Sequence, residues 1–232
     1  MRKIGIIGAM EEEVAALKEK MAIEEMRTIA GMEFCKGICE GQPVIVVRSG
    51  IGKVNAAICT QILCDVFGAE AIINTGVAGS LKNEINIGDI VLSEDALQHD
   101  MDATGFGYEP GVIPRMENSV FKGDEELIAL AEKVCKEVNP EIQVFRGRVV
   151  SGDQFISDRA VKERLIQLFE GYCTEMEGAA IAQAAWLNQV PFVVIRAISD
   201  KADGSAEMDY GEFEMKAIEH TVHLVTGMLR NM

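Results

Sequence analysis

The chain has 232 residues, 48% hydrophobic and 25% charged, a composition typical of a globular protein with one large core. The formal net charge is −15, because 37 acidic residues outnumber 22 lysines and arginines. A nucleic-acid binder needs a cationic face to neutralise phosphates, and no basic stripe is present, so we expect neither nucleic acid nor an anionic membrane as a partner.

Apolar, strand-like runs alternate with segments of helical periodicity along the whole chain. In chain order we expect a strand at 3–9, a helix at 11–21, strands at 32–39 and 42–49, a helix at 53–66, strands at 71–74 and 90–93, a helix at 124–137, a strand at 144–151, a helix at 158–169, a strand at 172–175, a helix at 177–188, a strand at 192–198 and a helix at 210–230. This alternation predicts an α/β fold, a single-domain three-layer α/β/α arrangement over residues 1–232 with a mixed, largely parallel central sheet.

Residues 98–120 fit neither pattern, because they combine three glycines and two prolines with Phe106 and Tyr108. A loop this long in a compact domain usually either works at a site or forms an interface. Neither a signal peptide nor a membrane-spanning segment is expected, since no apolar stretch approaches the roughly 20 residues that a spanning helix needs. The six cysteines lack CxxC spacing and predict buried thiols in a cytoplasmic protein, and the three histidines predict neither a metal site nor another cofactor.

Five sequence motifs lie where strands are expected to end, which is where open α/β sheets bind ligands. They read GAMEEE, SGIGK, NTGVAGS, TEMEG and RAISD. Three of them carry an acid, at Glu13, Glu177 and Asp200. Each acid taken alone is more simply interpreted as a helix cap or as a first-turn residue favoured by the helix dipole. The convergence of three carboxylates is the feature that needs a functional explanation.

The glycine motifs do not match the common phosphate-binding loops. GIIGAM is not GxGxxG, and SGIGKV has Val47 where the first glycine of a P-loop belongs and Val54 where Ser or Thr holds magnesium. Neither a dinucleotide site nor an NTPase is supported, and the glycines at 50, 52, 76 and 79 are equally well interpreted as tight turns.

The motifs taken together closely resemble those of the bacterial 5'-methylthioadenosine/S-adenosylhomocysteine nucleosidases of the purine nucleoside phosphorylase superfamily. The matching motifs, in this order and at these spacings, are GAMEEEV, SGIGKVNAA, INTGVAGSL, GDIVLS, VSGDQFI, EMEGAAIA and PFVVIRAISD. The resemblance runs from Ile4 to about Phe213, and GAMEEE selects the hydrolase branch. It implies a homodimer that uses no cofactor and splits 5'-methylthioadenosine and S-adenosylhomocysteine, and usually also 5'-deoxyadenosine, into adenine and the 5'-substituted ribose, in methionine salvage and methyl-cycle recycling.

Breaking an N-ribosidic bond builds positive charge on the ribose and negative charge on the base, so an acid, a base and ribose-binding groups are required. By the resemblance, Asp200 protonates adenine N7, Glu13 activates water and Glu177 binds the ribose hydroxyls. Further substrate contacts are implied for Met10, Ile51, Val77, Ala78, Gly79, Phe155, Ile156, Met176 and Tyr210, and from the neighbouring subunit for Ala103, Phe106 and Pro114.

Two positions favour water over phosphate as the nucleophile. The Glu13 carboxylate repels an anion, and Val77 lacks the hydroxyl with which many relatives bind phosphate. Val77 also cannot give the catalytic Asp the hydrogen bond that a Ser supplies there in some nucleosidases. Three alternatives stay open: a phosphate-dependent phosphorylase, another nucleosidase such as one acting on futalosine-type nucleosides, and a non-catalytic nucleoside-binding protein.

Overall fold

The computed structural model describes residues 1–204 and 206–232, without the side chains of residues 207–209 and 212. The strands are β1 (Ile4–Gly8), β2 (Ala22–Ile29), β3 (Met32–Cys39), β4 (Gln42–Arg48), β5 (Ala71–Ser80), β6 (Ile90–Gln98), β7 (Phe121–Lys122), β8 (Val144–Ser151), β9 (Cys173–Glu175) and β10 (Phe192–Asp200). The helices are α1 (Glu11–Glu19), α2 (Lys53–Asp65), α3 (Glu125–Val138), α4 (Arg159–Phe169), α5 (Gly178–Leu187) and α6 (Ala206–Arg230). The expected mixed α/β fold is therefore confirmed.

All the strands join in one mixed sheet, in the order β10-β6-β8-β9-β5-β1-β4-β3-β2, with β7 paired to β6. The strands β10, β5, β1 and β4 run parallel in a row, so their carboxyl ends meet at one edge. β10 also pairs with β6, and this second pairing closes five strands into a ring. The strand periodicity alone did not predict that closure, because periodicity says nothing about which strands pair.

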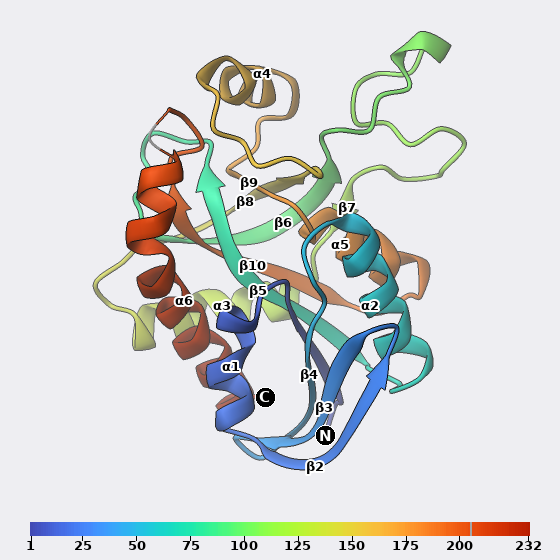
Figure 1. Ribbon diagram of the computed structural model, residues 1–232, viewed down its shortest axis with the longest axis vertical. Coiled ribbons are helices and arrows are strands. Elements are labelled where there is room, and N and C mark those ends of the chain that lie inside the picture. Colours follow the sequence, from blue (N-terminus) through green and yellow to red (C-terminus); the bar gives the residue numbers. More distant parts are fainter. Residues whose placement is uncertain (205) are drawn as a thin grey trace.

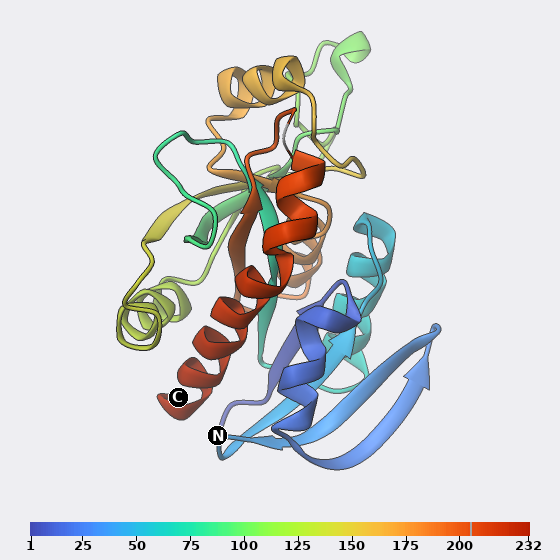
Figure 2. The same ribbon diagram turned by 60° about the vertical axis from the view of Figure 1, so that its left-hand side comes forward.

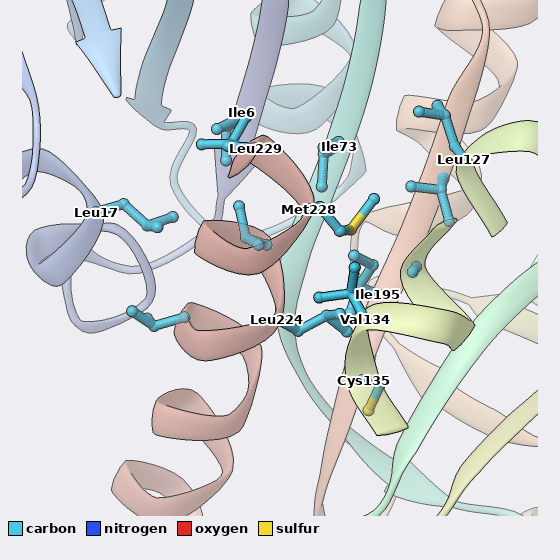
Figure 3. Packing of buried hydrophobic residues seen from close by; sticks show 14 of the residues in the cluster. Ile6, Leu17, Ile73, Leu127, Val134, Cys135, Ile195, Leu224, Met228 and Leu229 are labelled. Carbon is cyan, nitrogen blue, oxygen red and sulfur yellow. The ribbon is translucent and has the colours of Figure 1, made fainter. Parts of the chain in front are cut away.

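Helices cover both faces of the sheet (Figures 1 and 2). α1, α3 and α6 bury a cluster on one face that includes Leu17, Val134 and Leu224, packed on Ile6 and Ile195 (Figure 3). α2 and α5 bury a second cluster against the other face. The strands between them are buried on both sides, which explains their continuous apolar character.

The structure adds one long strand that the sequence pattern missed. β2 is exposed except at its last residue, Ile29, and among the described strands it pairs with β3. Its residues therefore lack the apolar–polar alternation that marks a half-buried strand. β5 and β6 also extend beyond their expected ends, and α6 begins before Tyr210. The six cysteines are free thiols, of which Cys64 is half-buried and the others are buried.

Of the four glycines interpreted as tight turns, two lie in turns and two lie within a strand. Gly50 and Gly52 do turn the chain, with φ of 84° and 97°. Gly76 and Gly79 instead lie within β5, where a Cβ at Gly76 would clash with the Arg196 guanidinium and one at Gly79 would lie 2.7 Å from Asp200 Oδ1. These glycines make room for charged side chains of the neighbouring strand. No helix in residues 1–204 and 206–232 is long and apolar enough to cross a bilayer.

Candidate active site

A cavity of about 460 Å³ opens at the carboxyl ends of β1, β5 and β10, the sheet edge that the motifs predicted. Its walls contain twelve of the predicted site residues, namely Met10, Glu13, Ile51, Val77, Ala78, Gly79, Phe155, Ile156, Met176, Glu177, Asp200 and Tyr210. Ala9, Gln154, Thr174, Glu175 and Ser199 complete the lining. The three acids singled out in the sequence therefore converge in one place.

Asp200 ends β10 and is 2% exposed. It does not occupy the N-cap position of a helix, because β10 continues to this residue and α6 begins only at Ala206. Its Oδ1 accepts a hydrogen bond from the Ala202 N–H at 2.7 Å, and its Oδ2 accepts one from the Ser199 hydroxyl at 2.9 Å. Ser199 thus donates to Asp200 a side-chain hydrogen bond of the kind that Val77, which has no hydroxyl, cannot make.

Glu13 lies in the first turn of α1 and is 2% exposed. Its Oε2 accepts hydrogen bonds from the N–H groups of Ala9 (2.6 Å) and Met10 (3.1 Å), and its Oε1 accepts one from the Val77 N–H (3.2 Å). Burial raises the pKa of the Glu13 carboxyl, while the Arg196 charge and the three backbone hydrogen bonds act in the opposite direction. Glu13 therefore both caps its helix and faces the cavity.

Arg196 places a buried positive charge behind the carboxylates. The residue is 1% exposed, and its guanidinium donates hydrogen bonds to Glu175 and, at 2.8 Å, to Asn74 Oδ1. Its Nη2 lies 3.7 Å from Glu177 Oε2, and the other Glu177 oxygen accepts the Gly52 N–H at 2.8 Å. Burial raises the pKa of Glu177 to about 7, the Glu175 charge adds to this rise, and Arg196 opposes it.

Sequence reasoning missed Glu175 and Arg196. Glu175 accepts hydrogen bonds from the Ser151 hydroxyl and from the N–H groups of Glu177 and Gly178, so it anchors the start of α5 as well as Arg196. The signal was present, because EMEG carries two acids two residues apart and RAISD begins with a cation inside an apolar strand. A charge in such a strand requires a partner.

An aromatic wall closes one side of the cavity. The Phe155 ring is half-exposed and meets the Tyr210 ring edge-on, with centroids 6.0 Å apart. The Tyr210 hydroxyl donates a hydrogen bond to Glu214 and lies 3.4 Å from Met10 Sδ. Ile156, the next residue after Phe155, is buried.

The remaining three predicted residues, Ala103, Phe106 and Pro114, do not line this cavity. They belong to the segment between β6 and β7, which projects from the body of the molecule (Figures 1 and 2). Phe106 is 88% exposed at the end of a short 3₁₀ turn, Thr104–Phe106. Within one chain, this loop therefore leaves the pocket without these apolar side chains.

Comparisons with known proteins agree with this architecture. The family described as Phosphorylase superfamily matches residues 3–230. A 5'-methylthioadenosine/S-adenosylhomocysteine nucleosidase of Bacillus cereus is 43% identical over 231 residues, 99% of each chain. The structure of a nucleosidase of the same name from Colwellia psychrerythraea, in complex with adenine, is 40% identical with a TM-score of 0.94, covering 98% of this chain and 94% of that one. The structure of a futalosine hydrolase from Helicobacter pylori is 34% identical with a TM-score of 0.94, covering 100% and 98%.

The raised pKa of Glu177 predicts a pH-dependent contribution to stability. With a folded pKa of about 7 against an ordinary 4.5, the folded protein retains a proton that the unfolded chain has released. This contribution is fully present below the unfolded value and is lost as pH rises through the folded value. Glu177→Gln removes the titration, so the variant should gain stability relative to the wild type as pH rises from about 5 to about 8.

Urea unfolding at several pH values measures this difference. Glu137→Gln, a change at an exposed position of α3, is the matched control and should follow the wild type at every pH. A stability difference between Glu177→Gln and wild type that stays constant across the range contradicts the prediction.

Proposed function

The chain belongs to the 5'-methylthioadenosine/S-adenosylhomocysteine nucleosidases of the phosphorylase superfamily, and on this premise we propose how its cavity hydrolyses the N-ribosidic bond of these two nucleosides. The products are adenine and the 5'-thioribose compound. The observation that carries the proposal is the meeting of Glu13, Glu177 and Asp200, all buried, in one cavity with apolar walls.

Asp200 is assigned as the general acid. The departing adenine accumulates negative charge, and a proton delivered to N7 neutralises it in the transition state. The hydrogen bonds from Ser199 and Ala202 fix the orientation of both carboxyl oxygens. The Ser199 oxygen also lies 3.5 Å from the Ala78 carbonyl oxygen, so its hydroxyl can donate to that carbonyl and accept a hydrogen bond from a neutral Asp200.

Glu13 is assigned as the base that takes a proton from the attacking water. Burial raises its pKa, which makes the carboxylate a better proton acceptor than an exposed one. The same negative charge disfavours inorganic phosphate, and the Val77 side chain offers it no hydroxyl. Both features support hydrolysis over phosphorolysis.

Glu177 is assigned to the ribose hydroxyls. One of its oxygens is held by the Gly52 N–H, which fixes the orientation of this carboxyl group in the cavity lining. The carboxylates of Glu13, Glu175 and Glu177 contribute to the lining beside the acid Asp200, whereas the Arg196 cation lies behind it. A site with excess negative charge stabilises the positive charge that develops on the ribose.

Phosphate-free release of adenine tests the proposed function. The purified chain should release adenine from 5'-methylthioadenosine and from S-adenosylhomocysteine in phosphate-free buffer, with no rate increase when phosphate is added. Futalosine belongs in the same assay, because the Helicobacter pylori futalosine hydrolase has a similar structure. A requirement for phosphate with formation of a ribose 1-phosphate contradicts the proposal, and so does exclusive turnover of futalosine.

We predict that Asp200→Asn lowers kcat by about 10²- to 10⁴-fold, because the amide cannot protonate the base. Nucleoside binding, measured by calorimetry, should persist in this variant. Glu13→Gln should lose kcat on a similar scale, because the amide cannot accept a proton from water. Wild-type rates in either variant, at an unchanged unfolding midpoint, contradict the assigned role.

We also propose that the active form is a homodimer in which each loop completes the partner's pocket. The 5'-alkylthio group needs an apolar wall, and the ring of Phe106, 88% exposed in the single chain, offers one. Ala103 and Pro114 lie in the same loop and would contribute beside it.

Mixed dimers test this arrangement. Phe106→Ala should raise KM for 5'-methylthioadenosine about tenfold, through lost burial of one aromatic side chain. Mixing it with Asp200→Asn should form hybrid dimers in which the intact acid faces an intact Phe106, so part of the activity should return at low KM. No low-KM activity after subunit exchange would show that Phe106 does not act across the interface.

A further inference from the structure

Lys162 is a buried cation that the reaction described above does not use. It lies on α4 and is 7% exposed, although lysines are rarely buried without a partner. Burial lowers the pKa of its ammonium group, while the negative charges of Asp203 and Asp200 act in the opposite direction. Desolvation of an ammonium group is unfavourable, so a buried lysine requires stabilising contacts.

The contacts of Lys162 lie in the segment directly after the proposed general acid. Its ammonium donates a hydrogen bond to the Lys201 carbonyl oxygen and lies 3.8 Å from Asp203 Oδ2. The Ala202 N–H donates to Asp200 Oδ1 at 2.7 Å. The Lys201 carbonyl and the Ala202 N–H are the two ends of one planar peptide unit. Lys162 therefore donates a hydrogen bond to the carbonyl of the same peptide whose N–H donates one to Asp200.

This peptide leads into an unusual backbone conformation. Ala202 has a φ of 51°, in the left-handed region that residues with a Cβ rarely adopt. Its side chain is fully buried in a small cluster with Ile156 and Leu165. The surrounding structure must hold such a conformation in place, and the bond from Lys162 is a direct restraint on it.

α4 also connects this restraint to the other wall of the cavity. The helix begins at Arg159, where the Asp158 side chain caps it, only a few residues after Phe155 and Ile156. Lys162 thus connects the helix that follows Phe155 and Ile156 to the segment that follows the acid.

We propose, on the basis of the proposed function, that Lys162 is a positioning residue for Asp200 and acts through the Lys201–Ala202 peptide. A charged donor on a peptide carbonyl polarises the unit and strengthens the hydrogen bond that its N–H makes. The Asp200 carboxyl then keeps one orientation before and after it gives up its proton.

Three substitutions at Lys162 and one control test this role. Lys162→Met removes the donor and should lower kcat for 5'-methylthioadenosine about tenfold, with KM changed less than about twofold. Lys162→Arg keeps a charged donor and should stay within about threefold of wild type, with Lys162→Gln between the two. Arg159→Met removes a cation from an exposed position of the same helix, where it pairs with Glu163, and should leave kcat unchanged.

A second measurement does not depend on turnover. Hydrogen exchange of the Ala202 amide should become at least about tenfold faster in Lys162→Met than in wild type, and Lys162→Arg should restore its protection. Unchanged kcat and unchanged exchange in Lys162→Met overturn the inference, as does an equal loss of kcat in Lys162→Arg. If the wild type releases no adenine, the proposed function fails, and the exchange rate still tests the restraint.

Discussion

The buried guanidinium of Arg196 is the interaction on which the site depends. It lies among the carboxylates of Glu13, Glu175 and Glu177, and without a cation there these groups would repel one another in a poorly solvated interior. Breaking a buried ion pair from one side costs about 3–5 kcal/mol, so the charge belongs to the fold as much as to the chemistry. Its place within the sheet requires Gly76 on the neighbouring strand, where a Cβ would occupy the space of the guanidinium.

Capping and catalysis are not competing explanations for the acids at the strand ends. Glu13 accepts the Met10 N–H as a helix-capping residue does, and the same carboxyl faces the cavity. Glu177 directly precedes α5, yet its side chain bonds the distant Gly52 N–H instead of its own helix. Asp200 is the last residue of its strand and lies well before the first residue of α6. Local sequence patterns alone cannot distinguish these three situations.

The sequence predicted the positions of most strands and helices, but not where β5 and β6 end or which side chains contact one another. Helix and strand positions followed from periodicity, the three acids followed from motifs at expected strand ends, and the other nine predicted residues that line the cavity followed from the family resemblance. Glu175, Arg196 and Lys162 did not, because their importance arises from partners more than 20 positions away in sequence. The edge strand β2 was missed for a different reason, since an exposed strand leaves no periodic apolar signal.

Backbone N–H groups help to orient all three acids of this site. Glu13 is held by Ala9, Met10 and Val77, Glu177 by Gly52, and Asp200 by Ala202. Such bonds do not depend on the identity of the side chain. The backbone N–H of Val77 therefore still donates to Glu13, although its side chain offers no hydroxyl to phosphate. It follows that the residues that fix these peptides in place control the chemistry from outside the cavity. Lys162, with its bond to the Lys201 carbonyl, occupies such a position for the acid that the departing base requires.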